Sequence, residues 1–484
     1  MTSEENFKLV VLSGGTATNE LVSVFKSIAP TVSYILPISD NGGSTSEIIR
    51  VIGGPAIGDI RSRLTRLIPP HKESLRVLLS FRLSSDPAIA KDEWNSIVDG
   101  THKLWSDINT STKEIFRAFF IHIHVELLKR SKYQYSQSSS KKQFRYELAN
   151  IGNLFLTGVR LFVGSLDSAI ELFCKLAEID SSIEVLPCIN TNFTYHISAL
   201  LENGLIITGQ SQISHPSHRE IVIDVYPPPI DRTRPSSPTE DMIRTSYFGT
   251  PALDGINIDV PINEVALSRN SYLVPESVDE EDDDEEELGN VPQYTHPELK
   301  KSQLHFNKTD IEPLLSPIKR IFYVSPYGQE IRPTAPHTVT SCIANTNVLI
   351  YSIGSLMTSI VPIVILKGVG KAIAENKTTK KKILLLNGCF DRETFGMAAV
   401  DFLNVIIQSA RYSEQSDDAD TVDWSNYISH LVFMNDSNIH VDKEYLESTK
   451  NIKCVEVKRQ GESDFFDTNS LQEALKHIVY NGLD

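Results

Sequence analysis

The stretch Phe7–Arg66 decides the fold and reads FKLVVLSGGTATNELVSVFKSIAPTVSYILPISDNGGSTSEIIRVIGGPAIGDIRSRLTR. It opens with Phe7–Leu12, a mostly apolar run short enough for a strand that is buried on both faces. Ser13-Gly14-Gly15-Thr16 follows at once, and from Asn19 the apolar residues recur at helical spacing until Pro30. The sequence therefore predicts a strand, a glycine turn and a helix.

A turn of this kind suits an anion. Backbone N–H groups at the start of a helix have no intrahelical acceptor, and the helix dipole adds partial positive charge, so a phosphate fits there. Gly14-Gly15 alone matches neither the Walker nor the dinucleotide fingerprint, and it would serve equally as a plain tight turn. Two further glycine-rich segments favour the anion site: Ser39–Ser44 (SDNGGS), after a predicted strand at Val32–Ile38, and Gly53–Arg61 (GGPAIGDIR). Loops that leave parallel strands at their carboxyl ends share one crevice.

The two ends of the chain share an α/β pattern. Strands alternate with helices there, which is typical of a doubly wound, Rossmann-like parallel sheet. The pattern resumes after the middle of the chain with a strand at Arg320–Ser325, and Glu393–Ser409 is expected to be helical. Between the two ends, four segments are expected to form a small β-rich satellite sheet, with Asn203-Gly204 as a hairpin turn: Ile183–Ile189, Thr194–Leu201, Leu205–Gly209 and Arg219–Val225.

Composition divides the chain into three parts. Residues 1–226 and 310–484 are expected to be the N-terminal and C-terminal parts of one α/β domain. Residues 227–309 are rich in Pro, Ser, Thr and acids and cannot bury enough apolar area to offset chain entropy, which predicts a long, disordered, acidic insertion. Asp279–Glu287 is an unbroken run of nine acids, and without it the formal net charge of −16 falls to −7.

The composition also excludes several classes of function. With 40% hydrophobic and 22% charged residues the chain is typical of globular proteins, and its acidic charge argues against general binding to nucleic acid or anionic membranes. The N-terminus has no signal-peptide pattern, and no run of about twenty uncharged apolar residues occurs. Five cysteines without a C-x-x-C pair indicate reduced thiols of the cytosol or nucleus, and we predict the cytoplasm.

The residues at the predicted strand ends are nearly all small hydrogen-bond donors. They favour a nucleoside diphosphate or nucleotide sugar, with Asp40 and waters as the site of an optional Mg²⁺ ion. We see no nucleophile paired with a base near these loops, so any chemistry would be transfer between two bound ligands. The predicted binding residues here are Gly14, Gly15, Thr16, Asn41, Gly42, Gly43, Ser44, Gly354, Ser355, Thr358, Ser359 and Asn387.

Three charged residues near the loops complete the predicted site. Asp40 and Asp59 are the candidate catalytic carboxylates, although Asp59 also suits the N-cap of a helix. Arg61, like its neighbour Arg63, either neutralises phosphate charge or is a surface arginine.

The same residues carry a resemblance. The order GGT, then SDNGGS, then GDIR resembles the family of 2-phospho-L-lactate transferase (CofD) and the related gluconeogenesis-factor (YvcK-like) proteins, and it is closer to the second branch. Further matches follow in order: Ile151–Leu154, Ile353–Pro362, Asn387 and Glu393-Thr394. The chain departs from the family pattern at Ala17, where a third glycine is usual, and at Asn41, where a second aspartate is usual. The change at Asn41 removes a potential metal ligand.

The resemblance makes the function concrete. It implies that Asn153 faces the ligand, whereas the residue alone would equally be a self-satisfied amide at a helix start. It also implies two activities. Transferase members move phospholactate from a guanosine-diphosphate-linked donor onto a deazaflavin alcohol with magnesium, whereas the other branch is similar to a binder of UDP-sugars that regulates carbon flow. We therefore expect a CofD-like protein that binds a nucleoside diphosphate conjugate, with transferase activity possible. The alternative is a non-enzymatic regulator, and a homodimer is one option for its assembly.

Overall fold

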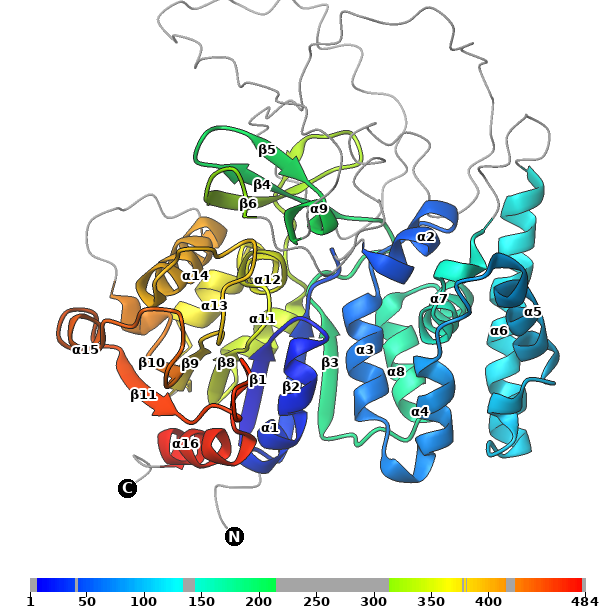
Figure 1. Ribbon diagram of the computed structural model, residues 1–484, viewed down its shortest axis with the longest axis horizontal. Coiled ribbons are helices and arrows are strands. Elements are labelled where there is room, and N and C mark those ends of the chain that lie inside the picture. The colour runs from blue at the N-terminus through cyan, green and yellow to red at the C-terminus, as the bar shows by residue number, and fades with distance from the viewer. Residues whose placement is uncertain are drawn as a thin grey trace, which may run out of the picture.

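The computed structural model describes residues 7–39, 42–133, 144–214, 313–376, 378–379, 381–414 and 423–480. Its centre is a seven-stranded sheet in the order β11-β10-β9-β8-β1-β2-β3, and every neighbouring pair is parallel (Figure 1). The strands are β1 (Lys8–Leu12), β2 (Thr31–Leu36), β3 (Ile183–Pro187), β8 (Val348–Tyr351), β9 (Lys381–Leu385), β10 (His430–Met434) and β11 (Lys453–Val457).

The predicted doubly wound fold is confirmed. From β1 the chain moves through β2 to β3 at one edge, and it later returns to the other side of β1 and moves from β8 to β11 at the opposite edge. The strand order therefore reverses between β1 and β8, and this topological switch point is where open α/β sheets bind ligands. Strands from both ends of the chain share this one sheet.

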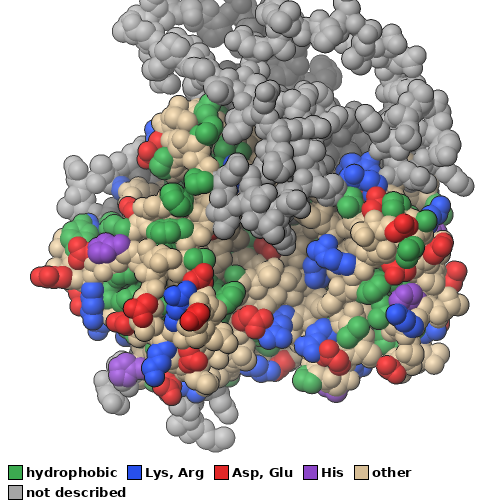
Figure 2. All heavy atoms as spheres, in the orientation of Figure 1, with side chains coloured by type: hydrophobic (Ala, Val, Ile, Leu, Met, Phe, Trp, Pro, Cys, Tyr) green, Lys and Arg blue, Asp and Glu red, His purple; other side chains and the backbone are tan. Residues whose placement is uncertain are grey.

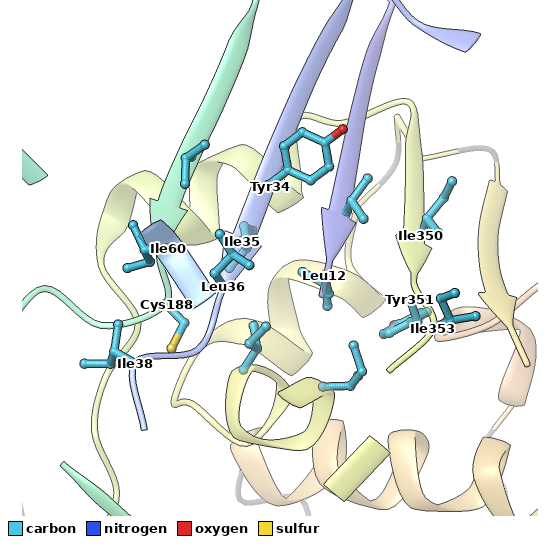
Figure 3. Close-up of a cluster of buried hydrophobic side chains, with 14 of the residues drawn as sticks. Leu12, Tyr34, Ile35, Leu36, Ile38, Ile60, Cys188, Ile350, Tyr351 and Ile353 are labelled. Carbon is cyan, nitrogen blue, oxygen red and sulfur yellow. The ribbon is translucent and has the colours of Figure 1, made fainter. Parts of the chain in front are cut away.

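The centre of the sheet is buried on both faces, as its apolar runs predict. Leu9, Val10, Val11 and Leu12 of β1 are each at most 1% exposed. Figure 3 shows side chains of β1, β2, the β8 region and α3 (Ile60) gathered in one buried cluster. The hydrophobic core therefore extends to the carboxyl ends of these strands, where buried side chains pack against the start of the loops.

Helices cover both faces and extend the molecule beyond β3. Figure 1 shows α3, α4 and α8 beside β3, with α5, α6 and α7 farther out, while α1 packs on α16. The helices are α1 (Val22–Ile28), α2 (Gly43–Val51), α3 (Gly58–Leu67), α4 (Glu73–Ser80), α5 (Pro87–Asp99), α6 (Thr110–Tyr133), α7 (Ile151–Val163), α8 (Leu166–Leu176), α9 (Gln210–Ser214), α11 (His337–Ala344), α12 (Val361–Val364), α13 (Val369–Ala374), α14 (Ala399–Glu414), α15 (Lys443–Lys450) and α16 (Thr468–Tyr480). None of these described helices is long and apolar enough to cross a membrane.

The predicted satellite sheet exists, but two strands were predicted to lie in the wrong sheet. It is antiparallel, in the order β5-β4-β6-β7, and lies beyond the carboxyl ends of the main strands (Figure 1). The hairpin at Asn203-Gly204 joins β4 (His196–Leu201) to β5 (Ile206–Thr208) as predicted, and β7 is Glu330–Ile331. However, β3 pairs with β2 in the main sheet, and the strand predicted to resume the α/β pattern is β6 (Ile318–Val324) of the satellite. A short apolar run specifies a strand but not its partner.

Several predicted features lie outside the described residues: the strand at Arg219–Val225, the insertion at 227–309, and the pair Asp40 and Asn41. On the face in Figure 2, basic and acidic side chains of the described part are intermixed rather than gathered into one basic patch.

Candidate functional site

Two loops and one helix start meet at the switch point. The loop Ser13–Thr16 leaves β1, and the loop that leaves β8 runs through Gly354 into a π-helical turn, η7 (Leu356–Ile360). A Cβ atom added to Gly14 would lie 2.7 Å from Ser359 Oγ, and one added to Gly15 would lie 2.5 Å from Asp59 Oδ1. The loops after β1 and β8 and the start of α3 are therefore in contact, as the sequence hypothesis requires.

The glycines of these loops serve two purposes. Gly14 and Gly15 do not have positive φ angles, so they are not needed for the turn. They are needed because a side chain on either would collide with Ser359 or Asp59. Gly354 has a φ of 134°, a region that side-chain-bearing residues rarely adopt. Substituting Gly354 would therefore strain the loop after β8 even though its nearest neighbour, Ala17, leaves it room.

Arg63 lies behind the loop after β1. Its side chain is fully buried, with its guanidinium carbon 4.5 Å from the centre of the Tyr34 ring, and burial lowers its pKa to about 10. Its Nη2 donates to the carbonyl oxygens of Gly14 (3.2 Å) and Gly15 (3.4 Å), and its Nε and Nη1 have no hydrogen-bond partner. A positive charge is thus held beneath the loop.

The contacts of Arg63 set the direction of the loop's N–H groups. In a trans peptide the C=O and N–H point in opposite directions. Because Arg63 holds the carbonyls of Gly14 and Gly15, the N–H groups of Gly15 and Thr16 point away from it. Within the described part of the chain, the N–H groups of Gly14, Gly15 and Thr16 have no acceptor. Successive free N–H groups of this kind form an anion-binding concavity.

Asp59 lies in the first turn of α3 and is not its N-cap. The N-cap is Ile57, and no side chain caps the helix, so the capping interpretation of Asp59 is wrong. The carboxylate instead packs against Gly14 and Gly15, with Oδ2 3.6 Å from a Cβ added to Gly14. A negative charge therefore lies beside the free N–H groups.

A second set of predicted residues forms its own network. The Asn153 side chain donates from Nδ2 to Ser44 Oγ (2.7 Å) and accepts from Arg61 Nε (3.0 Å), so both ends of this buried amide are in use. Burial lowers the pKa of Arg61 to about 10. Gly42 is the N-cap of α2 and Gly43 has a φ of 55°. This network connects α2, α3 and α7, and it joins the crevice through α3.

The loop after β8 is held by residues from the loop after β9. Asn387 accepts from the Gly354 N–H (3.1 Å) and donates to the Gly354 carbonyl (2.8 Å), so it holds the peptide groups on both sides of Gly354. The hydroxyls of Ser355 and Thr358 donate to Glu393 Oε1 at 3.2 Å and 2.7 Å. These predicted donors are therefore committed to a carboxyl group, whereas Ser359 lies beside Gly14.

Glu393 is the residue that the list of predicted site residues missed. It is 4% exposed, and burial, with a smaller contribution from the charge of Asp391, raises its pKa to about 7. The predicted helix at Glu393–Ser409 is wrong in its start, because α14 begins at Ala399 and Glu393 lies in the preceding loop. Its place in the Glu393-Thr394 pair of the family pattern was the one signal that could have identified it.

The described residues test the expected Mg²⁺ only in part. No group of three His, Cys, Asp or Glu side chains is arranged to hold a metal within the described ranges, and Asp40 lies outside them. The carboxylate of Asp59, which lies against Gly14 and Gly15, is an oxygen ligand of the type that Mg²⁺ takes. Elsewhere, a hollow of about 400 Å³ lies at the ends of β10 and β11, and none of its lining residues (Asn435, Asp436, Lys458, Arg459, Gly461 and Glu462) belongs to the predicted site.

The chain matches known proteins over almost its whole length. The family model described as 2-phospho-L-lactate transferase CofD matches residues 9–479. An uncharacterized protein of Saccharomyces cerevisiae, YNL011C, is 41% identical over 483 residues, which cover 97% of this chain and 99% of the yeast protein. A protein of Vibrio cholerae named "Putative gluconeogenesis factor" is 35% identical over 68 residues, 14% of this chain and 23% of that protein.

Solved structures agree on the fold. Two crystal structures of protein BH3568 from Bacillus halodurans, one of them described as a member of the UPF0052 family, superpose with TM-scores of 0.54 and 0.53. Each is 15% identical and covers 97% of this chain and 99% of the other. At this identity the likeness concerns the fold alone. The family match over residues 9–479 and the full-length yeast relative show that this chain belongs to the CofD family.

Proposed function

We propose that this chain binds a nucleoside diphosphate conjugate at the switch point between β1 and β8, with the diphosphate on the loop Ser13–Thr16. One observation carries the proposal: three consecutive N–H groups without acceptors in the described structure, with Arg63 behind them. Backbone N–H groups and a buried positive charge are complementary to phosphate oxygens. Ser359 adds a hydroxyl beside Gly14.

A divalent cation fits this proposal. Asp59 lies against Gly14 and Gly15, and a diphosphate bound there would meet its carboxylate. A bound Mg²⁺ would relieve the repulsion between the carboxylate and the phosphates, and this ion is usually held by one or two carboxylates together with substrate phosphates. Asp59 and Asp40 are the residues that would hold the ion, and it would supply charge neutralisation of the phosphates.

The reaction class that fits best is transfer of a phosphorus-containing group, as in the transferase that gives the family its name. The groups assembled at the crevice donate hydrogen bonds and place charge, and they suit the positioning of two ligands rather than covalent catalysis. A non-enzymatic sensor of nucleotide sugars is the second candidate, favoured by the partial match to the gluconeogenesis factor. All five cysteines are free thiols, which supports our expectation of the cytoplasm.

Calorimetric titration with GDP, UDP and a UDP-sugar, with and without Mg²⁺, tests the binding proposal. The unmodified protein is expected to bind at least one of them saturably. Arg63→Met should weaken that binding by about tenfold or more, since it removes the charge-assisted hydrogen bonds, worth about 1.5–3 kcal/mol each, that orient the loop carbonyls. Arg66→Met is the matched control, because Arg66 lies on the same helix but contacts the Asn19 carbonyl instead.

No saturable binding to any of these nucleotides, or equal weakening by both variants, would overturn the binding proposal. The two candidate functions are separated by product analysis. Release of the nucleoside monophosphate from a conjugate in the presence of an acceptor alcohol supports a transferase. A conjugate that binds and is recovered unchanged supports the sensor.

A further inference from the structure

Glu393 has an unusual hydrogen-bonding environment. Three hydroxyls meet at its Oε1: Ser214 at the end of α9 (2.5 Å), Thr358 in η7 (2.7 Å) and Ser355 just before η7 (3.2 Å). Ser214 Oγ is also 3.1 Å from Thr358 Oγ1. Two segments that are far apart in the sequence, the end of α9 and the loop after β8, therefore fix one oxygen of this carboxyl group.

The second oxygen has the opposite environment. Oε2 is buried and has no hydrogen-bond partner among the described residues. An ionised Glu393 would keep half of its negative charge on a buried oxygen without a donor, which is costly. A neutral Glu393 would accept three hydrogen bonds at Oε1 and carry its proton on Oε2, as a donor that still lacks an acceptor. The three hydroxyl donors at Oε1 favour the carboxylate, but burial and the missing donor at Oε2 outweigh them and favour the neutral acid.

The charges around Glu393 act in the same direction. Among the described residues, Asp391 is the charged neighbour that contributes, and its negative charge disfavours a second one. The Asp391 Oδ1 is held by the N–H groups of Glu393 and Thr394 and by the Thr394 hydroxyl. The adjacent Arg392 donates to the Gln212 carbonyl. In the printed sequence, neither α9 nor η7 brings an ionisable side chain.

Glu393 also lies at the edge of the proposed nucleotide site. Its partners Ser355 and Thr358 belong to the loop that leaves β8, and the next residue, Ser359, lies beside Gly14. The peptide of Gly354 in the same loop is held by Asn387. A ligand in the crevice between β1 and β8 would therefore meet the loop that Glu393 organises.

We propose that Glu393 binds the ligand as a neutral carboxylic acid that donates a hydrogen bond from Oε2 to an oxygen of the nucleotide conjugate. Binding then takes up a proton when the free protein is partly ionised at this residue. This inference rests on the proposed nucleotide site and assigns the site a further binding residue. The ligand group it selects is an acceptor, either a phosphate oxygen or a hydroxyl oxygen of the conjugated group.

A matched pair of variants tests the proposal. In Glu393→Gln the amide oxygen can accept the three hydroxyls and the NH₂ group can replace the acid as donor, whereas Glu393→Ala removes both. The probe is a UDP- or GDP-sugar, because both of its phosphates stay ionised around neutral pH. Dissociation constants are measured for the full-length protein and both variants at pH 6 and pH 8.

The unmodified protein should bind about tenfold more weakly at pH 8 than at pH 6, as a group titrating near neutrality loses its proton. Glu393→Gln should bind equally at both pH values, close to the affinity of the unmodified protein at pH 6. Glu393→Ala should bind weakly at both. Loss of binding in Glu393→Gln would overturn the proposal, because it would mean that the ionised carboxylate is required. Affinity of the unmodified protein that does not change with pH would also overturn it.

A ligand-free measurement separates this inference from the proposed function. Infrared difference spectra between the unmodified protein and Glu393→Gln at pH 6 should show the C=O band of one neutral carboxyl group. A carboxylate band there contradicts the neutral acid, whatever binds. If the neutral band is present but no nucleotide binds, the proposed function fails and the ligand contact of Glu393 fails with it.

Discussion

The two loops that face each other at the switch point are built from different chemistry. The loop after β1 offers backbone N–H groups and has a buried arginine behind it, whereas the loop after β8 contains hydroxyls and has a buried carboxyl group behind it. Both are placed by the same sheet, β1 and β8 being adjacent strands. The fold therefore supplies the crevice, and the residues behind each loop determine which part of a ligand it suits. The arginine side suits the diphosphate, and the carboxyl side suits an acceptor oxygen of the conjugate.

The largest loss of nucleotide affinity should come from a side chain that fills the space at Gly15. In Gly15→Ala the new Cβ would lie 2.5 Å from Asp59 Oδ1 and 2.9 Å from the Asp59 Cα, so loop or helix must move. Because the N–H groups of the loop then lose their alignment, nucleotide affinity should fall by about a hundredfold or more. Calorimetric titration measures it, with circular dichroism to confirm folding.

Gly164→Ala is the matched control for Gly15→Ala. Gly164 has a φ of 83° at the end of α7 with nothing within 4 Å of an added Cβ, so its substitution costs about 1 kcal/mol of backbone strain away from the crevice. Binding should survive in this control. If both variants bind as the unmodified protein does, the loop after β1 is not the phosphate site.

Glu393 should make stability depend on pH on the carboxyl side of the crevice. Burial raises its pKa from 4.5 to about 7 in the folded protein. Its contribution to stability is therefore fully present below about pH 4.5 and is lost as the pH rises through about 7, up to roughly 3 kcal/mol in all. Relative to Glu393→Gln, the unmodified protein should lose stability between pH 5 and pH 8.5 in urea denaturation. Parallel pH profiles for the two proteins would contradict a raised pKa.

The smallest loss of nucleotide affinity should come from removing the hydrogen bonds by which Asn387 holds the loop after β8. Asn387→Ala removes the two hydrogen bonds to the Gly354 peptide, which should cost about 1–2 kcal/mol of stability and weaken nucleotide binding only a fewfold. Asn192→Ala, which removes one hydrogen bond to the Gly164 carbonyl, should leave binding unchanged. Thermal denaturation and titration of both variants measure these effects. Equal affinities for the two variants would show that the Gly354 loop does not contact the ligand.

Local pattern was sufficient for much of the fold. The apolar run at Phe7–Leu12 became β1, and Asn203-Gly204 turns the satellite hairpin. The assignments of β3 and β6 failed because strand pairing depends on which edges the rest of the chain leaves open, and the sequence of one strand does not contain that information.

The sequence by itself determined that glycine loops follow strands at one edge of a doubly wound sheet, because hydrophobic period and turn residues are local properties. Only the tertiary structure decided what lies behind each loop. The sequence left Arg63 open between a phosphate-neutralising and a surface arginine, and it placed Glu393 only in the family pattern. The burial of both residues, with the pKa shifts it causes, exists only where distant segments pack around them. The tertiary structure likewise showed that Asn153 is bound by Ser44 and Arg61. The desolvation of a side chain and its hydrogen-bond partners both depend on the residues that surround it in space, and the fold determines which residues those are.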